Sequence, residues 1–265
     1  MGATTGITWT EKTWNPWRGC TKVSPGCDLC YMFRDQRRFG NDPEVVVRTK
    51  TWNDPIKWQR QAEAAGKTFL VFTCSWSDWF HKDADTWRDE AWATIKRCPN
   101  LIFQILTKRP QLIAARLPAD WGDGYSNVWL GVSVEEQRFL WTRYRFLEDI
   151  PARVRFLSAE PLLGPLDLIK PSEPGRPQCD WLILGGESAA RNDETPRVMR
   201  YEWARSLRDQ CVALGVRFFF KQWGDGLPSD QLNQISAGHQ MMHHGGDVLD
   251  GRQWHEFPAG YQRSE

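Results

Sequence analysis

Long hydrophobic runs, a strong net charge and an even set of cysteines are all missing from this sequence of 265 residues. No apolar stretch reaches the length of a membrane-spanning helix, and residues 1–15 lack the apolar core of a signal peptide. The net charge of +1 provides no overall field to attract nucleic acid or a membrane surface. Seven cysteines is an odd count, and thiols stay reduced in the cytosol. The sequence therefore predicts a cytoplasmic protein with no membrane partner and no disulfide framework.

The rest of the composition is that of a globular protein, with 41% hydrophobic and 25% charged residues. Barrels of the α/β class commonly have this length as one domain. We therefore expect a single domain over residues 1–265, with a cysteine loop at 14–33 and a C-terminal extension from about 225 to 265. The unusual feature is the number of tryptophans, 16, which we expect in the core and in the walls of a pocket.

Short apolar runs alternate with helical patterns along the chain. Strands are predicted at 69–73, 101–106, 128–132, 154–157, 181–184 and 216–220, with a shorter one at 7–10. Helices are predicted at 31–39, 85–97 with Asp85 as N-cap, 135–149, and 201–214 with Gly215 after its end. The strand runs are apolar along their whole length, which suits parallel strands buried on both faces. The prediction is an α/β fold, a TIM-like full or partial (β/α) barrel with mostly parallel strands.

Nearly every predicted strand runs directly into a polar cluster. A single polar strand end carries little information, but barrel enzymes and open α/β sheets build their sites at the carboxyl ends of their strands. Six such clusters in series favour a shared pocket. The polar side chains that we expect around this pocket are Ser75, Asp78, Lys108, Glu135, Glu160, Glu187 and Lys221.

The stretch WNPWRGCTKVSPGCDLCYMF carries three cysteines, Cys20, Cys27 and Cys30, in a C-x6-C-x2-C pattern. Three thiolates on one loop suit a soft metal, and a turn at Pro25–Gly26 can fold the first cysteine toward the other two. An iron–sulfur cluster held by three cysteines leaves one iron open, and the location of the loop at the pocket mouth favours this interpretation. The alternatives are three unliganded cysteines, or a zinc site that needs a distant fourth ligand. The candidate fourth ligands are His81, His239, His243 and His244. The other cysteines are expected in the core, and they are Cys98, Cys179 and Cys211.

This arrangement resembles the radical S-adenosylmethionine (SAM) superfamily, in which three cysteines after the first barrel strand hold a [4Fe-4S] cluster whose open iron binds SAM. More closely, the whole chain resembles an uncharacterised phage and bacterial family of three-cysteine-motif proteins. The stretches that carry this resemblance are WNPWRGCTKVSPGCDLCY, SWSDWFH, FQILTKRP, NVWLGVSVE, RFLSAEPLLGP, LILGGES, FFFKQWG and LDGRQWHEFP. The resemblance implies a [4Fe-4S] cluster, SAM as co-substrate, an electron donor, and a radical that removes a hydrogen atom from the substrate.

Several features depart from the superfamily pattern. The commonest spacing is C-x3-C-x2-C, whereas here the first gap is six residues, and Leu29 replaces the aromatic residue that usually precedes the third cysteine. The Gly-Gly-Glu motif that binds the SAM amine normally follows the second strand, but here Gly185–Glu187 follows a late strand, and CSWSD occupies the early position. Cofactor-binding residues are therefore predicted at both places, and they are Ser75, Ser77, Asp78, Gly185, Gly186 and Glu187. Tyr31, directly after the third cysteine, and Ser133, at a strand end, are also predicted to bind the cofactor.

Four residues at strand ends are predicted to act in catalysis, and each also has a plainer structural interpretation. The Cys74 thiol can return a hydrogen atom to a product radical, or it is a small buried hydrophobe. Lys108, together with Arg109, can hold a phosphate or the SAM carboxylate, or the two form a solvated basic pair. Glu160 needs a cationic partner if it is buried, and Lys108 or Lys221 can supply it, in which case Lys221 is only a counter-ion.

The substrate is predicted to be a nucleotide or a nucleic acid, either DNA or RNA. Basic residues with Trp52 and Trp58 among them can follow a phosphate backbone and stack bases, or they form a charged helical face whose tryptophans point inward. Two other functions stay open: a zinc-stabilised binding module without redox chemistry, and a non-radical enzyme that uses the open iron as a Lewis acid. The basic residues are Arg34, Arg37, Arg38, Arg48, Lys50, Lys57 and Arg60.

Overall fold

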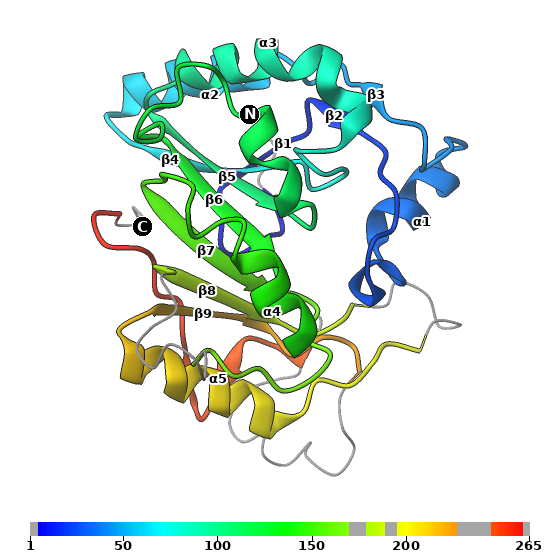
Figure 1. Ribbon diagram of the computed structural model, residues 1–265, viewed down its shortest axis with the longest axis vertical. Helices are drawn as coiled ribbons and strands as arrows, with labels where there is room; N and C mark the ends of the chain where they lie inside the picture. The colour runs from blue at the N-terminus through cyan, green and yellow to red at the C-terminus, as the bar shows by residue number, and fades with distance from the viewer. Residues whose placement is uncertain (1–4, 170–178, 189–194, 227–244, 262–265) are drawn as a thin grey trace.

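Seven parallel strands form the main sheet of the computed structural model, which describes residues 5–169, 179–188, 195–226 and 245–261. Their order is β1-β4-β5-β6-β7-β8-β9, with β1 and β9 at opposite edges. The sheet is curled but open, so the predicted α/β barrel is confirmed in its partial form (Figure 1). The strand bounds are Lys12–Trp14 for β1, Phe69–Thr73 for β4, Leu101–Thr107 for β5, Val128–Ser133 for β6, Val154–Ala159 for β7, Trp181–Gly185 for β8 and Arg217–Gln222 for β9.

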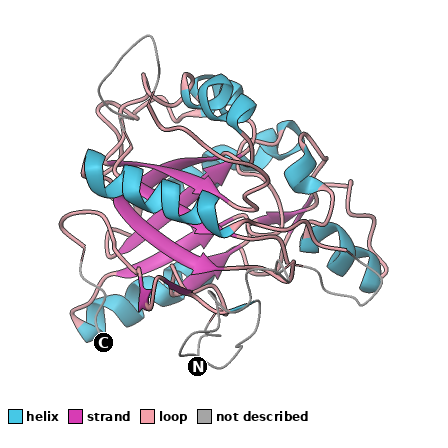
Figure 2. Ribbon diagram, turned by 90° about the horizontal axis from the view of Figure 1, so that it is seen from below, coloured by secondary structure: helices cyan, strands magenta, loops and turns pink. Residues whose placement is uncertain are grey.

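Helices α2 to α5 pack on one face of this sheet, while α1 stands apart at its carboxyl edge (Figures 1 and 2). Gly215 ends α5 with a φ of +72°, the left-handed conformation that glycine adopts most readily. None of the helices in the described ranges has the length and apolar character needed to cross a membrane. The helix bounds are Tyr31–Arg38 for α1, Asp54–Ala65 for α2, Asp85–Lys96 for α3, Gln137–Tyr144 for α4 and Tyr201–Leu214 for α5. Two short antiparallel pairs are β2 (Trp17–Arg18) with β3 (Val47–Arg48), and β10 (Val248–Leu249) with β11 (Arg252–Gln253).

The predicted strand at 7–10 is wrong, because the first strand of the sheet is β1. Residues 7–10 instead pack against the inner face of the sheet, where Trp9 is buried with its ring centroid 4.6 Å from that of Phe72. The side-chain oxygen of Thr10 accepts a hydrogen bond from the backbone N–H of Phe72 at 3.1 Å. The side chain of Thr10 therefore accepts the hydrogen bond from β4 that the backbone carbonyl of a neighbouring strand would otherwise accept.

Two helix predictions also differ from the structure. Asp85 is the first residue of α3 rather than its N-cap, because its carboxylate accepts hydrogen bonds from Arg88 and from Arg116 Nε, the latter at 2.7 Å. Helix α4 is shorter than predicted at both ends. Glu135 is fully buried at the end of β6 and so cannot begin an exposed helix, and residues 145–149 continue as turns.

The inner face of the sheet is closed at one end and open at the other. Along its strands toward the amino end it is filled with aromatic side chains, and residues from the C-terminal segment cover the edge of β9 through a bridge between Phe219 and His255. Toward the carboxyl end the side chains become polar, and Ser133 and Ser158 are register partners on β6 and β7. The buried aromatic residues of this face are Trp9, Phe72, Trp129, Phe156, Trp181 and Phe219. The core therefore leaves space for a cavity at the carboxyl edge.

Candidate active site

A cavity of about 560 Å³ lies at the carboxyl edge of the sheet. Small-molecule sites commonly have volumes of about 300–1,000 Å³. The cysteine loop forms one side of this cavity, and the ends of β4 to β9 form the other. The predicted site residues that line it are Cys20, Cys27, Cys30, Tyr31, Cys74, Ser75, Ser77, Asp78, Lys108, Ser133, Glu160, Gly186, Glu187 and Lys221. The strand ends that the sequence placed around a shared pocket therefore do meet there.

The tryptophans contribute less to the cavity than expected. Trp9 and Trp76 line it, and most of the others are packed in the core. Trp52 and Trp58 are only 5% and 8% exposed, so the predicted stacking of bases on these two rings is wrong. The alternative, a charged face whose tryptophans point inward, describes this part of the chain, and Arg48 covers the Trp52 ring at 3.7 Å.

The three cysteines lie between β2 and α1. Cys27 ends a 3-10 turn over Pro25–Cys27, and Cys30 is the N-cap of α1. All three are free thiols. Burial raises the pKa of the Cys20 thiol to about 12 even though the guanidinium of Arg109 lies beside it, and burial also raises the pKa of Cys30. Binding of a metal would therefore have to displace protons from these thiols.

The chemistry of the donor set fits an iron–sulfur cluster, because the loop supplies three sulfurs around one cavity. Within the described ranges, no three His, Cys, Asp or Glu side chains are grouped so that they could hold a single metal ion. His81, a predicted zinc ligand, has both ring nitrogens engaged: Nδ1 accepts from the Asp83 N–H at 3.3 Å, and Nε2 lies 3.2 Å from Thr21 Oγ1. The other candidate histidines lie outside the described residues, and they are His239, His243 and His244.

Glu135, just after β6, holds the middle of the cysteine loop. Its Oε1 accepts a hydrogen bond from Ser24 Oγ at 2.8 Å, and a Cβ on Gly26 would lie 2.4 Å from its Cγ. The carboxylate is fully buried between two cations, with Lys108 Nζ at 3.3 Å and Arg143 Nη1 at 2.6 Å. Burial opposes ionisation, but the two cations lower the pKa of Glu135 below its usual value. A charged Glu135 therefore fixes this part of the loop over the cavity.

Arg109, just after β5, holds the start of the cysteine loop. Its Nη2 donates to the carbonyl and the hydroxyl of Thr21, both at 2.7 Å, and its Nη1 donates to Cys20 Sγ at 3.5 Å. The same Nη1 pairs with Asp78 Oδ2 at 3.1 Å. Asp78 also accepts from Thr107 Oγ1 and from two backbone N–H groups, so its carboxylate makes four hydrogen bonds. The cofactor contact predicted for Asp78 stays a prediction, and such a contact would compete with these bonds.

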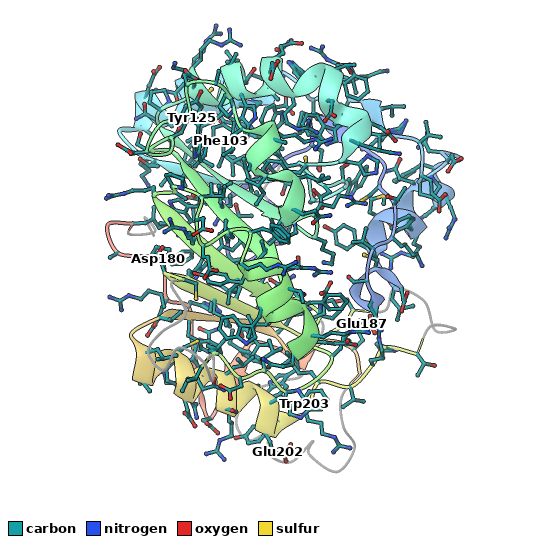
Figure 3. All side chains as sticks on the ribbon, in the orientation of Figure 1. Phe103, Tyr125, Asp180, Glu187, Glu202 and Trp203 are labelled. Carbon is teal, nitrogen blue, oxygen red and sulfur yellow. The ribbon has the colours of Figure 1, made fainter. Side chains whose placement is uncertain are left out.

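Arg197 connects the loop to the end of β8 through Glu187. The Glu187 carboxylate is buried and accepts hydrogen bonds from Nε of Arg197 at 2.8 Å, from its backbone N–H at 2.9 Å, and from Nη2. Nη2 also donates to the Pro25 carbonyl at 2.8 Å, and Nη1 pairs with Asp28 at 3.4 Å. Figure 3 shows Glu187 at the sheet edge nearer the cysteine loop and Asp180, which precedes β8, at the opposite edge. The acid of the Gly-Gly-Glu motif is thus paired with an arginine of this chain.

Glu160 and Lys221 form an ion pair in the cavity wall, with 2.5 Å between Oε2 and Nζ. Glu135 is predicted around the pocket but does not line the cavity, and neither does Gly185. Gly185 lies beneath the Glu160–Lys221 pair, where a Cβ would approach Glu160 Cγ to 3.3 Å, so its predicted contact with a cofactor is not supported by its position. A Cβ on Gly186 would lie 1.8 Å from the carbonyl oxygen of Trp223. Close packing at the sheet edge therefore accounts for both glycines.

The end of β4 also holds the cysteine loop. Cys74 is buried and has a φ of +59°, which is uncommon for a residue with a side chain. After this turn, Ser77 Oγ donates to the Gly19 carbonyl at 2.6 Å, and the Ser75 carbonyl accepts from the Tyr31 hydroxyl at 2.8 Å. Tyr31, Ser75 and Ser77 therefore position the loop as well as lining the cavity.

The residues of these contacts that sequence reasoning missed include Ser24, Arg143 and Arg197. Ser24 precedes the Pro25 turn, which is the one local signal that it is special. Arg143 lies in a predicted helix with nothing to distinguish it from its charged neighbours. Arg197 follows no strand or motif, so only the folded chain reveals its role.

The fold and the cavity together define an α/β partial barrel whose carboxyl edge carries a three-cysteine loop. The chain belongs to the family described as Protein of unknown function (DUF5131), whose model matches residues 4–258. This agrees with the predicted resemblance to an uncharacterised family, while the phage and bacterial origin and the three-cysteine-motif description of that family stay predictions. No curated protein matches the chain. One solved structure that resembles it, spore photoproduct lyase complexed with dinucleoside spore photoproduct, gives a TM-score of 0.46 at 13% identity, over 86% of this chain and 78% of the other.

Proposed function

We propose that this chain is an iron–sulfur enzyme of the radical SAM type that modifies or repairs a nucleotide or a nucleic acid. Cys20, Cys27 and Cys30 would hold the [4Fe-4S] cluster. The observation that carries the proposal is that several strand ends fix the position of the loop that bears these cysteines. Arg109 after β5, Glu135 after β6, and Arg197 through Glu187 after β8 each form a hydrogen bond with the loop, and the three thiols line one cavity of about 560 Å³.

Held by these three cysteines, a [4Fe-4S] cluster would supply one-electron chemistry to SAM, and through it the removal of a hydrogen atom from the substrate. The electron has to come from an external one-electron reductant. The chain would contribute an apolar part of the cavity wall, which limits the contact of water with reactive species. The apolar side chains in that part are Ile7, Trp9, Phe33, Phe72 and Leu106.

The polar part of the wall would bind and orient SAM and the substrate. Lys108 and Lys221 suit a carboxylate or a phosphate, and each is already paired with a carboxylate of the chain, Glu135 and Glu160 respectively. An anionic ligand would therefore bind at Lys221 beside a neutral pair, and at Lys108 beside a cluster that keeps a positive charge because Arg143 shares Glu135. The hydroxyl of Ser133, at the end of β6, can donate to or accept from a ribose hydroxyl.

Cys74 would return a hydrogen atom to the product radical. The S–H bond breaks, the hydrogen atom goes to the product, and the thiyl radical that remains takes an electron and a proton, the electron coming from the same external reductant. This role is supported by the position of Cys74 in the cavity wall and by its unusual backbone conformation, which the surrounding hydrogen bonds maintain.

Formation of 5′-deoxyadenosine tests this proposal. Anaerobically purified protein is treated with dithionite and SAM, and the product is measured by chromatography for the wild type, for Cys27→Ala, and for Cys98→Ala as a control whose thiol is buried in the core. The proposal expects product from the wild type and the control but not from Cys27→Ala. Iron without 5′-deoxyadenosine would indicate Lewis-acid chemistry instead, and a colourless zinc protein would indicate a binding module.

A further inference from the structure

Exposed apolar side chains are concentrated near the cysteine loop. In the described part of the chain, eight large hydrophobic side chains are exposed, and four of them lie between residues 23 and 45. These are Val23, Tyr31, Phe39 and Val45. Phe39 has the highest exposed fraction, 61%. A group of exposed apolar side chains in one segment of the chain points to a surface that contacts another molecule.

Helix α1 presents positive charge at the same place. Arg37 and Arg38 are exposed in its last turn, and within the described ranges neither forms an ion pair. Arg34 is partly neutralised by Asp35 at 3.2 Å. The buried side of the helix consists of Met32, Phe33 and Gln36, so its arginines project away from the body of the protein, and Figure 1 shows α1 standing apart from the other helices.

This surface is continuous with the cavity. Tyr31, the first residue of α1, lines the cavity and donates its hydroxyl hydrogen to the Ser75 carbonyl. At the other end of α1, the ring of Phe39 lies 6.2 Å from the ring of Trp76 with an angle of 36° between them, and Trp76 also lines the cavity. Aromatic rings therefore extend from the cavity mouth to the two arginines.

We propose that the α1 surface, which consists of Tyr31, Arg37, Arg38, Phe39 and Trp76, binds single-stranded nucleic acid beside the cavity. Arginines neutralise phosphates, and aromatic rings provide faces on which bases stack regardless of sequence. A single strand offers its bases to the cavity directly, whereas a base within a duplex must first be flipped out of the stack. The inference rests on the proposed function for the purpose of the cavity, but the binding itself needs no cluster.

The charge contribution is tested by measuring the binding of a short fluorescein-labelled single-stranded DNA by fluorescence anisotropy over a range of salt concentrations. The variant Arg37→Gln/Arg38→Gln removes both charges and keeps a good helix-forming residue at each position. Its affinity should fall about tenfold or more at low salt, and the slope of log affinity against log salt should become shallower by about 1.4, since each lost phosphate contact on a single strand contributes about 0.7. The matched control is Arg60→Gln, an exposed arginine on α2, which should bind as the wild type does.

The stacking contribution is tested at Phe39. Phe39→Ala should weaken binding about tenfold without changing the salt slope, and Phe39→Tyr should restore it because the ring remains. A far-ultraviolet circular dichroism spectrum identical to that of the wild type ensures that α1 is intact in each variant.

Three results would overturn the inference. The first is equal binding by Arg37→Gln/Arg38→Gln and Arg60→Gln. The second is a preference for duplex DNA of the same sequence. The third is displacement of the DNA by polyglutamate together with no effect of Phe39→Ala, which would identify an acidic protein as the partner.

The same assay separates this inference from the proposed function, because Cys27→Ala should bind DNA as the wild type does. A wild type that binds single-stranded DNA but forms no 5′-deoxyadenosine would refute the proposed function alone. Cleavage of SAM by a protein that binds no single strand would refute the α1 surface alone.

Discussion

The hydroxyl of Ser24 donates a hydrogen bond to the carboxylate of Glu135 over 2.8 Å, and this contact joins the cysteine loop to the end of β6 across 111 residues of sequence. The contacts from Arg109 to Thr21 and from Arg197 to Pro25 span 88 and 172 residues. The position of the three cysteines therefore depends on charged groups that distant strands place at the rim of the cavity. Substitutions of these groups should move the loop without removing the fold.

Replacement of Glu135 by glutamine should destabilise the protein. The amide keeps the shape and an acceptor for Ser24, but it leaves Lys108 and Arg143 beside a neutral group. Removal of one partner from a buried ionic cluster commonly lowers the free energy of unfolding by about 3–5 kcal/mol, and we expect about 3 kcal/mol because Lys108 is partly exposed. Urea denaturation followed by circular dichroism measures this change.

The neighbouring Glu136 provides the control for that experiment. Its carboxylate pairs with Arg138, whose side chain is 63% exposed. Glu136→Gln should therefore change the free energy of unfolding by less than about 1 kcal/mol. Equally small changes in Glu135→Gln and Glu136→Gln would contradict the role given to Glu135.

The stability of the wild type should also depend on pH through Glu135. Its pKa in the folded protein is lower than the value of 4.5 that it has when exposed, because Lys108 and Arg143 outweigh the effect of burial. The charged carboxylate thus contributes stability above pH 4.5, and this contribution is lost as the pH falls through the folded-state pKa. The difference in free energy of unfolding between the wild type and Glu135→Gln should shrink below pH 4.5. A difference that persists unchanged into more acidic solution would show that Glu135 carries no charge in the folded state.

Replacement of Arg197 by lysine should loosen the cysteine loop. Lysine keeps the charge but cannot bond Glu187 and the Pro25 carbonyl at the same time with a planar group. Amide hydrogen exchange over residues 24–28 should become faster, while exchange in the core of α5 should not change. Arg205→Lys, in an exposed pair with Asp250, is the matched control and should leave exchange at the loop as it is. Equal protection of residues 24–28 from hydrogen exchange in Arg197→Lys and Arg205→Lys would argue against the Arg197 contact.

Replacement of Gly186 by alanine should disrupt the sheet edge. The added Cβ would lie 1.8 Å from the carbonyl oxygen of Trp223, and a backbone atom cannot move aside without shifting β9. We expect the free energy of unfolding to fall by more than about 2 kcal/mol. Gly164→Ala is the control, because no atom lies within 4 Å of its added Cβ. Thermal melts in which the two variants behave alike would show that the close approach at Gly186 is relaxed in solution.

Much of the fold follows from local pattern. The run FLVFT predicts β4 with its observed bounds, and Tyr201–Leu214 is predicted as α5 because its apolar stripe ends at a glycine. The segment at 7–10 misleads for a physical reason. Trp9 is apolar, as a strand residue would be, because it packs on the inner face of the sheet against Phe72. Thr10 forms its hydrogen bond with β4 through its side chain and not through its backbone.

The cavity was predictable to the extent that it depends on strand direction. Parallel strands end at one edge, so Lys108, Glu160 and Lys221 had to lie near each other. The pairing of the charged side chains could not be predicted in the same way. The partners of Glu187 and Glu135 depend on how far Arg197 and Arg143 reach from elsewhere in the fold, and sequence spacing carries no information about that reach.

Iron and acid-labile sulfide content shows whether the three cysteines hold a cluster. The full chain is purified anaerobically after reconstitution, as wild type, as Cys27→Ala and as Cys98→Ala. We expect about four irons and about four sulfides per chain in the wild type and in Cys98→Ala, and their loss in Cys27→Ala. Zinc in place of iron in the wild type, or iron that remains at the same level in Cys27→Ala, would contradict the proposed cluster.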